Sequence, residues 1–167
     1  PELARGQWLV LLAAFLGWMF DGLEMGIFPL VARPALQEMQ AAAGVLDEQF
    51  VQMWMGKITA LFLLGAAAGG LVFGWLGDKV GRVRAMGASI FCFSIFSLVG
   101  YFAATPEQVL LLRFLAGMGV GGMWPTGVSL ASEAWSDASR PMISGLLGTS
   151  ANVGLVTLNT IGYFIHV

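Results

Sequence analysis

Apolar residues in this chain occur in long unbroken runs rather than in a short alternating pattern. Residues 58–77 and 85–104 each contain no charged side chain. An α-helix needs about 20 apolar residues to cross the hydrocarbon core of a bilayer, so each run is long enough to span. The pattern predicts spanning helices over about residues 8–31, 54–77, 85–104, 108–135 and 142–167.

The amino-acid composition is typical of an integral membrane protein. The chain has 57% hydrophobic and 11% charged residues, whereas a soluble domain carries about 25% charged residues. Only helices and closed barrels satisfy backbone polar groups in a bilayer, and barrel strands alternate over about ten residues. The sequence therefore predicts an all-α transmembrane protein, with the lipid bilayer as its surroundings. The net charge of -2 gives no support for nucleic-acid binding.

Basic residues near the helix ends predict the orientation. With the N-terminus in the cytoplasm, the inner side holds Arg5, Lys79, Arg82, Arg84 and Arg140, and the outer side holds Arg33 and Lys57. Cytoplasmic loops carry an excess of Lys and Arg. We therefore expect a cytoplasmic N-terminus and a cytoplasmic turn at residues 78–84. The longer connection at residues 32–53 is then external, acidic and partly helical.

Glycine spacing predicts close helix contacts. The second segment has Gly65-xxx-Gly69 and Gly70-xxx-Gly74, and the fourth has Gly117-xxx-Gly121. Small residues four apart lie on one helix face and let two backbones approach. This spacing indicates a closely packed bundle.

Three ionisable residues fall within predicted spans. Asp21 and Glu24 are three residues apart and share a helix face, and Arg113 lies at a similar depth on the fourth segment. A charge at membrane depth costs about 3 kcal/mol even on the lenient insertion scale, so it turns inward and pairs. We expect an Asp21/Glu24–Arg113 cluster, serving either as a coupling and substrate site or as a permanent structural salt bridge.

The fifth segment carries a second group of polar residues. Thr149, Asn152 and Asn159 fall on one helix face about 80° wide. Asn152 and Asn159 are candidate substrate contacts in a cavity wall. The alternative is that they form hydrogen bonds between helices, which are worth about 0.6 kcal/mol each.

The turn between the second and third segments carries a recognisable pattern. Gly74-xxx-Asp78-xx-Gly81-Arg82-x-Arg84 resembles the signature loop of the major facilitator superfamily in spacing and in helix order. Gly81 suits a tight turn with positive φ. The resemblance implies that this turn is a cytoplasmic gate, latching two halves of a transporter.

Two further motifs carry the same resemblance. The fourth segment begins with Arg113-Phe-Leu-Ala-Gly117 and continues to Gly121-Gly122, as in that superfamily. Glu133 followed by Arg140 is similar to the charged pair that sugar porters carry at the cytoplasmic end of this helix. We expect a network of Glu133 and Arg140 with Arg82, because both turns lie on the same face of the membrane. The alternative is that Glu133, Asp137 and Arg140 are solvated loop charges.

Asp21-Gly-Leu-Glu24 resembles the acid-x-x-acid motif of proton-coupled organic-acid symporters, including sialic acid and aromatic acid transporters. Gly121-Gly122-Met123-Trp124-Pro125 is similar to their Gly-Gly-Glu-Trp-Pro, with Met123 in place of the acid. The departure at Met123 either removes proton coupling or shifts it to the first helix. The resemblance implies alternating-access transport of a small polar solute, an organic acid or a sugar, with protons as partner.

Alternatives stay open beside this interpretation. Within the superfamily, the alternative is a drug or metabolite antiporter. A different class would be an intramembrane enzyme, for which the serines lack a protease context, or a channel or scaffold. We expect no enzyme activity, no cofactor and no metal site.

The resemblance covers the whole chain, which we interpret as the N-terminal bundle of a transporter. We expect truncation before a sixth helix and a missing C-terminal helical bundle as partner. The expected location is a plasma membrane, the inner membrane of a bacterium.

Overall fold

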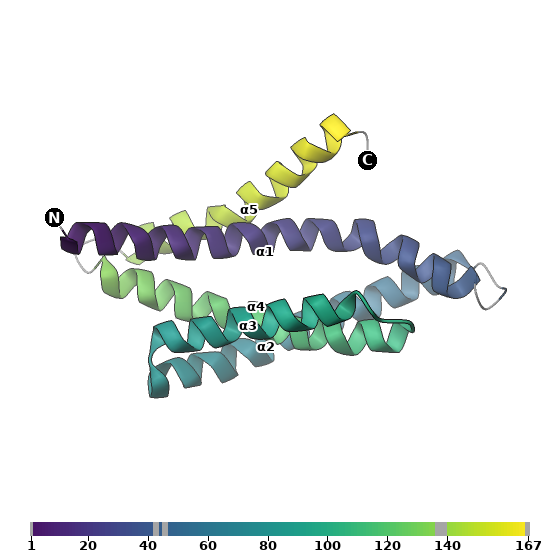
Figure 1. The fold of residues 1–167 in the computed structure, drawn as a ribbon, viewed down its shortest axis with the longest axis horizontal. Helices are drawn as coiled ribbons and strands as arrows, with labels where there is room; N and C mark the ends of the chain where they lie inside the picture. Colours follow the sequence, from purple (N-terminus) through teal and green to yellow (C-terminus); the bar gives the residue numbers. More distant parts are fainter. Residues whose placement is uncertain (1, 42–43, 45–46, 136–139, 166–167) are drawn as a thin grey trace. The chain divides into compact units, whose positions relative to one another are not determined.

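The computed structural model describes residues 2–41, 44, 47–135 and 140–165. These residues form α1 (Glu2–Ala41), α2 (Glu48–Val80), α3 (Arg82–Gly100), α4 (Pro106–Ala134) and α5 (Arg140–Ile165) (Figure 1). Each of the five is long and apolar enough to cross a membrane. The all-helical fold class is thereby confirmed.

Helices α1 and α2 extend beyond their apolar runs. At 1.5 Å per residue, the 40 residues of α1 span about 60 Å and the 33 of α2 about 50 Å, against a hydrocarbon core of about 30 Å. An apolar run marks only the part of a helix that lies in lipid. The connection predicted over residues 32–53 is consequently mostly helix, with α1 ending at Ala41 and α2 beginning at Glu48.

Local chemistry explains where α2 begins. Asp47 has an extended backbone, and its side chain accepts a hydrogen bond from the Gln49 amide at 2.9 Å, which caps the helix. Arg33 near the end of α1 forms an ion pair with Glu48 in the first turn of α2. Both contacts lie in the segment that the apolar pattern left as a loop.

The chain forms two compact units. Unit 1 comprises Pro1–Phe28 and Thr126–Val167, and unit 2 comprises Pro29–Pro125. Helices α1 and α4 each contribute to both units, and each contains proline within its helical span: Pro29 and Pro34 in α1, Pro125 in α4.

In unit 2, α2 and α4 approach through glycine on both sides. A Cβ added at Gly69 would lie 1.9 Å from the Met118 carbonyl oxygen, and one added at Gly121 would lie 1.8 Å from that of Ala66. Real Cβ atoms never come so close, so these positions require glycine. This contact uses the glycine spacing that the sequence analysis singled out in these two helices.

Helix α3 covers another face of α4 and lies beside α2, to which a tight turn joins it (Figure 1). The buried Ser89 hydroxyl donates to the Gly119 carbonyl, and the Cys92 thiol lies 3.6 Å from the Leu115 carbonyl. Gly119 lets the Phe93 backbone approach. Unit 2 therefore combines α2, α3 and the first part of α4 with residues 29–41 at the end of α1.

In unit 1, α1 packs on α5. A Cβ added at Gly22 would lie 2.0 Å from the Ala151 carbonyl oxygen, and one at Gly154 would lie 2.0 Å from that of Met19. At the start of α1, the Gln7 amide donates to the Ala134 carbonyl at 2.8 Å. The Trp135 indole donates to the Gln7 carbonyl at 3.1 Å, which joins the beginning of α1 to the end of α4.

Candidate functional site

The turn between α2 and α3 is tighter than the predicted turn over residues 78–84. One residue, Gly81, separates the two helices and has a φ of 99°, which confirms the expected positive φ. Asp78 lies one helical turn before Arg82, and their side chains form an ion pair at 3.1 Å. The Arg82 side chain is less exposed than that of Asp78, so the pair sits at the edge of the unit.

Two further cations surround this turn. The Lys79 ammonium lies 4.2 Å from the centre of the Trp75 ring, one helical turn earlier, and Arg84 is exposed. Exposed cation–π contacts contribute about 0.5–1 kcal/mol. A Cβ added at Gly74 would lie 3.9 Å from the Pro125 ring. The gate residues Gly74, Asp78, Gly81, Arg82 and Arg84 thus lie together at one end of unit 2.

The remaining predicted gate residues belong to unit 1. Glu133 is in the last turn of α4, and Arg140 begins α5, with its side chain outside the described part of the chain. The predicted network of Glu133 and Arg140 with Arg82 therefore stays a prediction.

The two acids of α1 are half-buried in unit 1. Gly22 and Gly26 mark the α1 face that packs on α5. At 100° per residue, Asp21 lies about 100° from Gly22 around the helix, and Glu24 about 160° from Gly26. Helix geometry therefore directs both acids away from α5.

Arg113 lies in unit 2, half-buried on α4. Its guanidinium carbon is 4.6 Å from the centre of the Phe62 ring of α2, which is 5% exposed. Such a contact holds the guanidinium plane over an apolar wall and is worth about 2 kcal/mol when desolvated. Since the acids and Arg113 belong to different units, the Asp21/Glu24–Arg113 cluster stays a prediction.

The polar residues of α5 lie on its exposed side. Asn152 and Asn159 are exposed, whereas Gly154, which touches α1, is buried. The Asn159 amide donates to the Leu155 carbonyl at 2.9 Å and the Thr149 hydroxyl to the Leu146 carbonyl at 2.7 Å, both within α5. These two bonds are not the interhelical kind that was the alternative to a cavity wall.

Sequence reasoning missed two features that the structure shows. The α1–α5 contact uses Gly22-xxx-Gly26, which has the same spacing as the glycines noticed in α2 and α4. A cavity at the end of unit 2 also went unnoticed, because its lining comes from three separate segments. Met123, which replaces the acid of the resembled motif, is buried.

Comparison with known proteins decides the family. Residues 7–167 match the Major Facilitator Superfamily, which is nearly the whole chain. The chain belongs to this superfamily. Members of this superfamily are membrane transporters rather than enzymes, so the multi-pass membrane location and the expected lack of enzyme activity agree with the family.

Several superfamily relatives are similar to this chain. The 4-hydroxybenzoate transporter PcaK of Pseudomonas aeruginosa is 30% identical over 89% of the chain and 31% of the relative. The niacin transporter NiaP of Acinetobacter baylyi is 27% identical over 90% of the chain and 32% of the relative. The inner membrane metabolite transport protein YgcS of Escherichia coli is 32% identical over 69% of the chain and 26% of the relative.

The chain thus spans about a third of the length of these superfamily relatives. No solved structure matches it.

Proposed function

We propose that this superfamily chain is the N-terminal part of a secondary transporter for small aromatic carboxylates. The observation that carries the proposal is the stacking of Arg113 on Phe62 within unit 2. Two relatives are named for 4-hydroxybenzoate and niacin, each of which is an aromatic ring bearing a carboxylate.

Arg113, placed over Phe62, offers the charged group that such a solute needs. A guanidinium binds a carboxylate through two parallel hydrogen bonds, and its planar fork fixes the direction of approach. The buried Phe62 ring beneath it keeps the guanidinium in position. In a span of low dielectric, this charge attracts an anion more strongly than it would in water.

The acids of α1 are the proposed proton carriers. Asp21 and Glu24 are half-buried within a membrane span, where ionisable groups are functional by default. We propose that proton binding at Asp21 or Glu24 accompanies solute binding at Arg113.

The rest of the transport cycle follows from the superfamily. In alternating access, one bundle rocks against a second around a central solute. The second bundle is the proposed partner, and Asn152 and Asn159 on the exposed side of α5 are proposed to contact the solute. The Asp78–Arg82 pair and its neighbours form the proposed latch at the cytoplasmic face.

The experiment uses the full-length transporter in proteoliposomes with labelled 4-hydroxybenzoate or nicotinate. Arg113→Lys keeps the charge but loses the planar fork, and Arg113→Gln loses both. We expect uptake to fall by about tenfold or more in the lysine variant and further in the glutamine variant. Arg33→Gln is the matched control, because it removes an exposed cation and should leave uptake within about twofold.

The outcomes separate the parts of this proposal. Uptake that survives in Arg113→Gln contradicts the role of Arg113. A transporter active on uncharged solutes but not on either acid contradicts the substrate class. If Asp21→Asn and Glu24→Gln both keep uptake that a proton gradient drives, the coupling assignment is wrong.

The latch has a test of its own. Asp78→Asn removes the ion pair with Arg82 but leaves the exposed surface and the Gly81 turn unchanged. We expect normal membrane expression with uptake slowed several-fold, because the latch stabilises one end state of the cycle. Uptake at the normal rate would count against the latch.

A further inference from the structure

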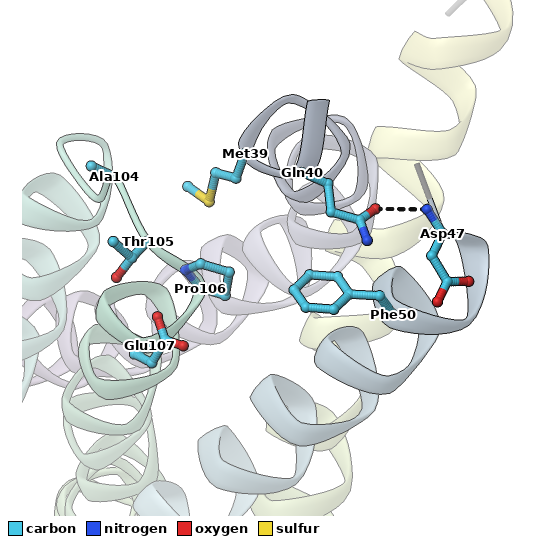
Figure 2. A pocket seen from close by; sticks show the side chains of 8 residues that line it. All are labelled: Met39, Gln40, Asp47, Phe50, Ala104, Thr105, Pro106 and Glu107. Carbon is cyan, nitrogen blue, oxygen red and sulfur yellow. Dashed lines mark hydrogen bonds between the residues drawn. The ribbon is translucent and has the colours of Figure 1, made fainter. Parts of the chain in front are cut away.

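A cavity of about 470 Å³ opens at the end of unit 2 opposite the basic turn (Figure 2). The turn follows the end of α2 and the start of α3. The cavity instead involves the end of α1, the start of α2 and the link from α3 into the start of α4. Its volume falls in the range of about 300–1,000 Å³ typical of small-molecule sites. The proposed transport site does not include it.

The two walls differ in chemistry. Figure 2 shows Met39, Gln40 and Phe50 across from Thr105 and Pro106. Met39, Phe50 and Pro106 give the cavity an apolar body. The thioether and the ring are polarisable surfaces that suit an aliphatic or aromatic portion of a ligand.

The charged groups of the lining are all acidic. Asp47 and Glu107 bring two carboxylates, and no Lys or Arg is among the described lining residues. One oxygen of Asp47 accepts from the Gln49 amide, which leaves its second oxygen for another donor. Glu107 makes no ion pair with a described residue. The cavity therefore attracts cations and repels the carboxylates proposed as transported solutes.

Gln40 supplies a further polar group from within the protein. It is only 8% exposed, and its Oε1 accepts a hydrogen bond from the Asp47 amide at 3.2 Å. Its amide nitrogen has no hydrogen-bond partner among the described residues. The hydrogen bond from the Asp47 amide fixes the Gln40 amide in one orientation beside the cavity. The dashed bond in Figure 2 shows how Asp47 holds the amide beside the cavity.

We infer that this cavity binds a small organic cation with an apolar body, at a site separate from the transported solute. The ammonium group would pair with one of the two carboxylates, Asp47 or Glu107, which lie on opposite sides of Phe50 in Figure 2. The Phe50 ring adds the attraction of an aromatic face for a cation. A bare metal ion fits less well, because no group of three or more His, Cys, Asp or Glu side chains in the described residues could hold one. The inference goes beyond the proposed transport function and does not depend on it.

Calorimetric titration of the purified full-length protein in uncharged detergent tests this site. The probe is phenethylammonium, compared with 2-phenylethanol and 3-phenylpropionate, which have similar bodies but neutral and negative ends. We expect saturable binding of the ammonium and weaker binding of the alcohol. Any binding of the carboxylate belongs to the proposed transport site and should not compete with the ammonium. Equal affinities of the ammonium and the alcohol, or no saturable binding of the ammonium, would overturn the inference.

Variants locate the binding. The double variant Asp47→Asn, Glu107→Gln should weaken phenethylammonium binding by about tenfold, since it removes both charges. Asparagine is as good a helix cap as aspartate, so α2 should keep its start and the thermal midpoint should stay unchanged. Glu38→Gln removes an exposed acid of α1 that does not line the cavity, and its affinity should stay within about twofold. Binding that is equally strong in the double variant contradicts the site.

Discussion

The α2–α4 contact of unit 2 and the α1–α5 contact of unit 1 are both built on glycine, but their surroundings differ. In unit 2 the glycines of both helices meet backbone over successive turns, and no charged residue lies between them in sequence. In unit 1, Gly22 lies between Asp21 and Glu24. The α2–α4 contact lies beside the proposed solute group Arg113, which precedes Gly117 by four residues, whereas the α1–α5 contact has the acids proposed for proton coupling on either side of Gly22.

The largest expected effect is at the α2–α4 contact. Gly121→Ala would place a Cβ 1.8 Å from the Ala66 carbonyl oxygen, so the two backbones must separate. Forcing extra volume into such a packed contact costs about 3 kcal/mol. We expect a much lower yield of folded protein and a lower thermal midpoint, followed by tryptophan fluorescence in detergent. Gly87→Ala is the control, because nothing lies within 4 Å of its added Cβ.

The α1–α5 contact should follow with a smaller loss. Gly154→Ala meets the Met19 carbonyl oxygen at 2.0 Å. Since α5 lies at one side of unit 1, it can shift more easily than α4, and we expect a loss of about 2 kcal/mol in the same fluorescence assay. A shift of α5 relative to α1 also changes the surroundings of Asp21 and Glu24. Proton-driven uptake should therefore fall by more than the loss of folded protein accounts for. A variant as unstable as Gly121→Ala would show that the two contacts are equally rigid.

The smallest expected loss is at Gly26. Its added Cβ would meet only the Leu158 and Leu155 side chains, the nearest atom at 2.5 Å. A leucine can change rotamer at a cost of about 1 kcal/mol, and alanine recovers about as much in helix propensity. We expect a thermal midpoint close to that of the parent. A loss as large as that of Gly154→Ala would mean that the leucines cannot move.

Gly145→Ala is the reference for this series of glycine-to-alanine variants. Gly145 has open space around it on α5, so Gly145→Ala should raise stability by up to about 1 kcal/mol through helix propensity alone. A fall in the thermal midpoint would show that this face of α5 is covered in the full-length protein.

Much of the fold could be predicted from the chain because lipid imposes a strict requirement on it. Charge-free runs such as residues 58–77 report membrane spans directly. The same signal stops at the bilayer surface. For this reason the connection at residues 32–53 was predicted only as partly helical, without the helix ends at Ala41 and Glu48. A hydrogen-bond cap such as Asp47 is a local signal that could have placed the start of α2.

The candidate site was predictable only where its contacts are local. Asp78 and Arg82 are four residues apart on one helix, so their spacing alone suggests the pair. Arg113 and Phe62 are far apart in sequence, and their stacking depends on the register of α4 on α2. Gln40 and Glu107 meet one cavity for the same reason, since only packing brings three segments to one place.

The prolines of α1 and α4 have a mechanical consequence. The chain passes from one unit to the other at Phe28–Pro29 in α1 and at Pro125–Thr126 in α4, in both cases within continuous helix. A proline cannot donate the main-chain bond to the carbonyl four residues earlier, so the bending stiffness of each helix is lowest at these two points. A change of helix direction there strains one main-chain hydrogen bond fewer than it would elsewhere in the helix. Each unit can thus keep its glycine contacts intact while the covalent links between the units flex.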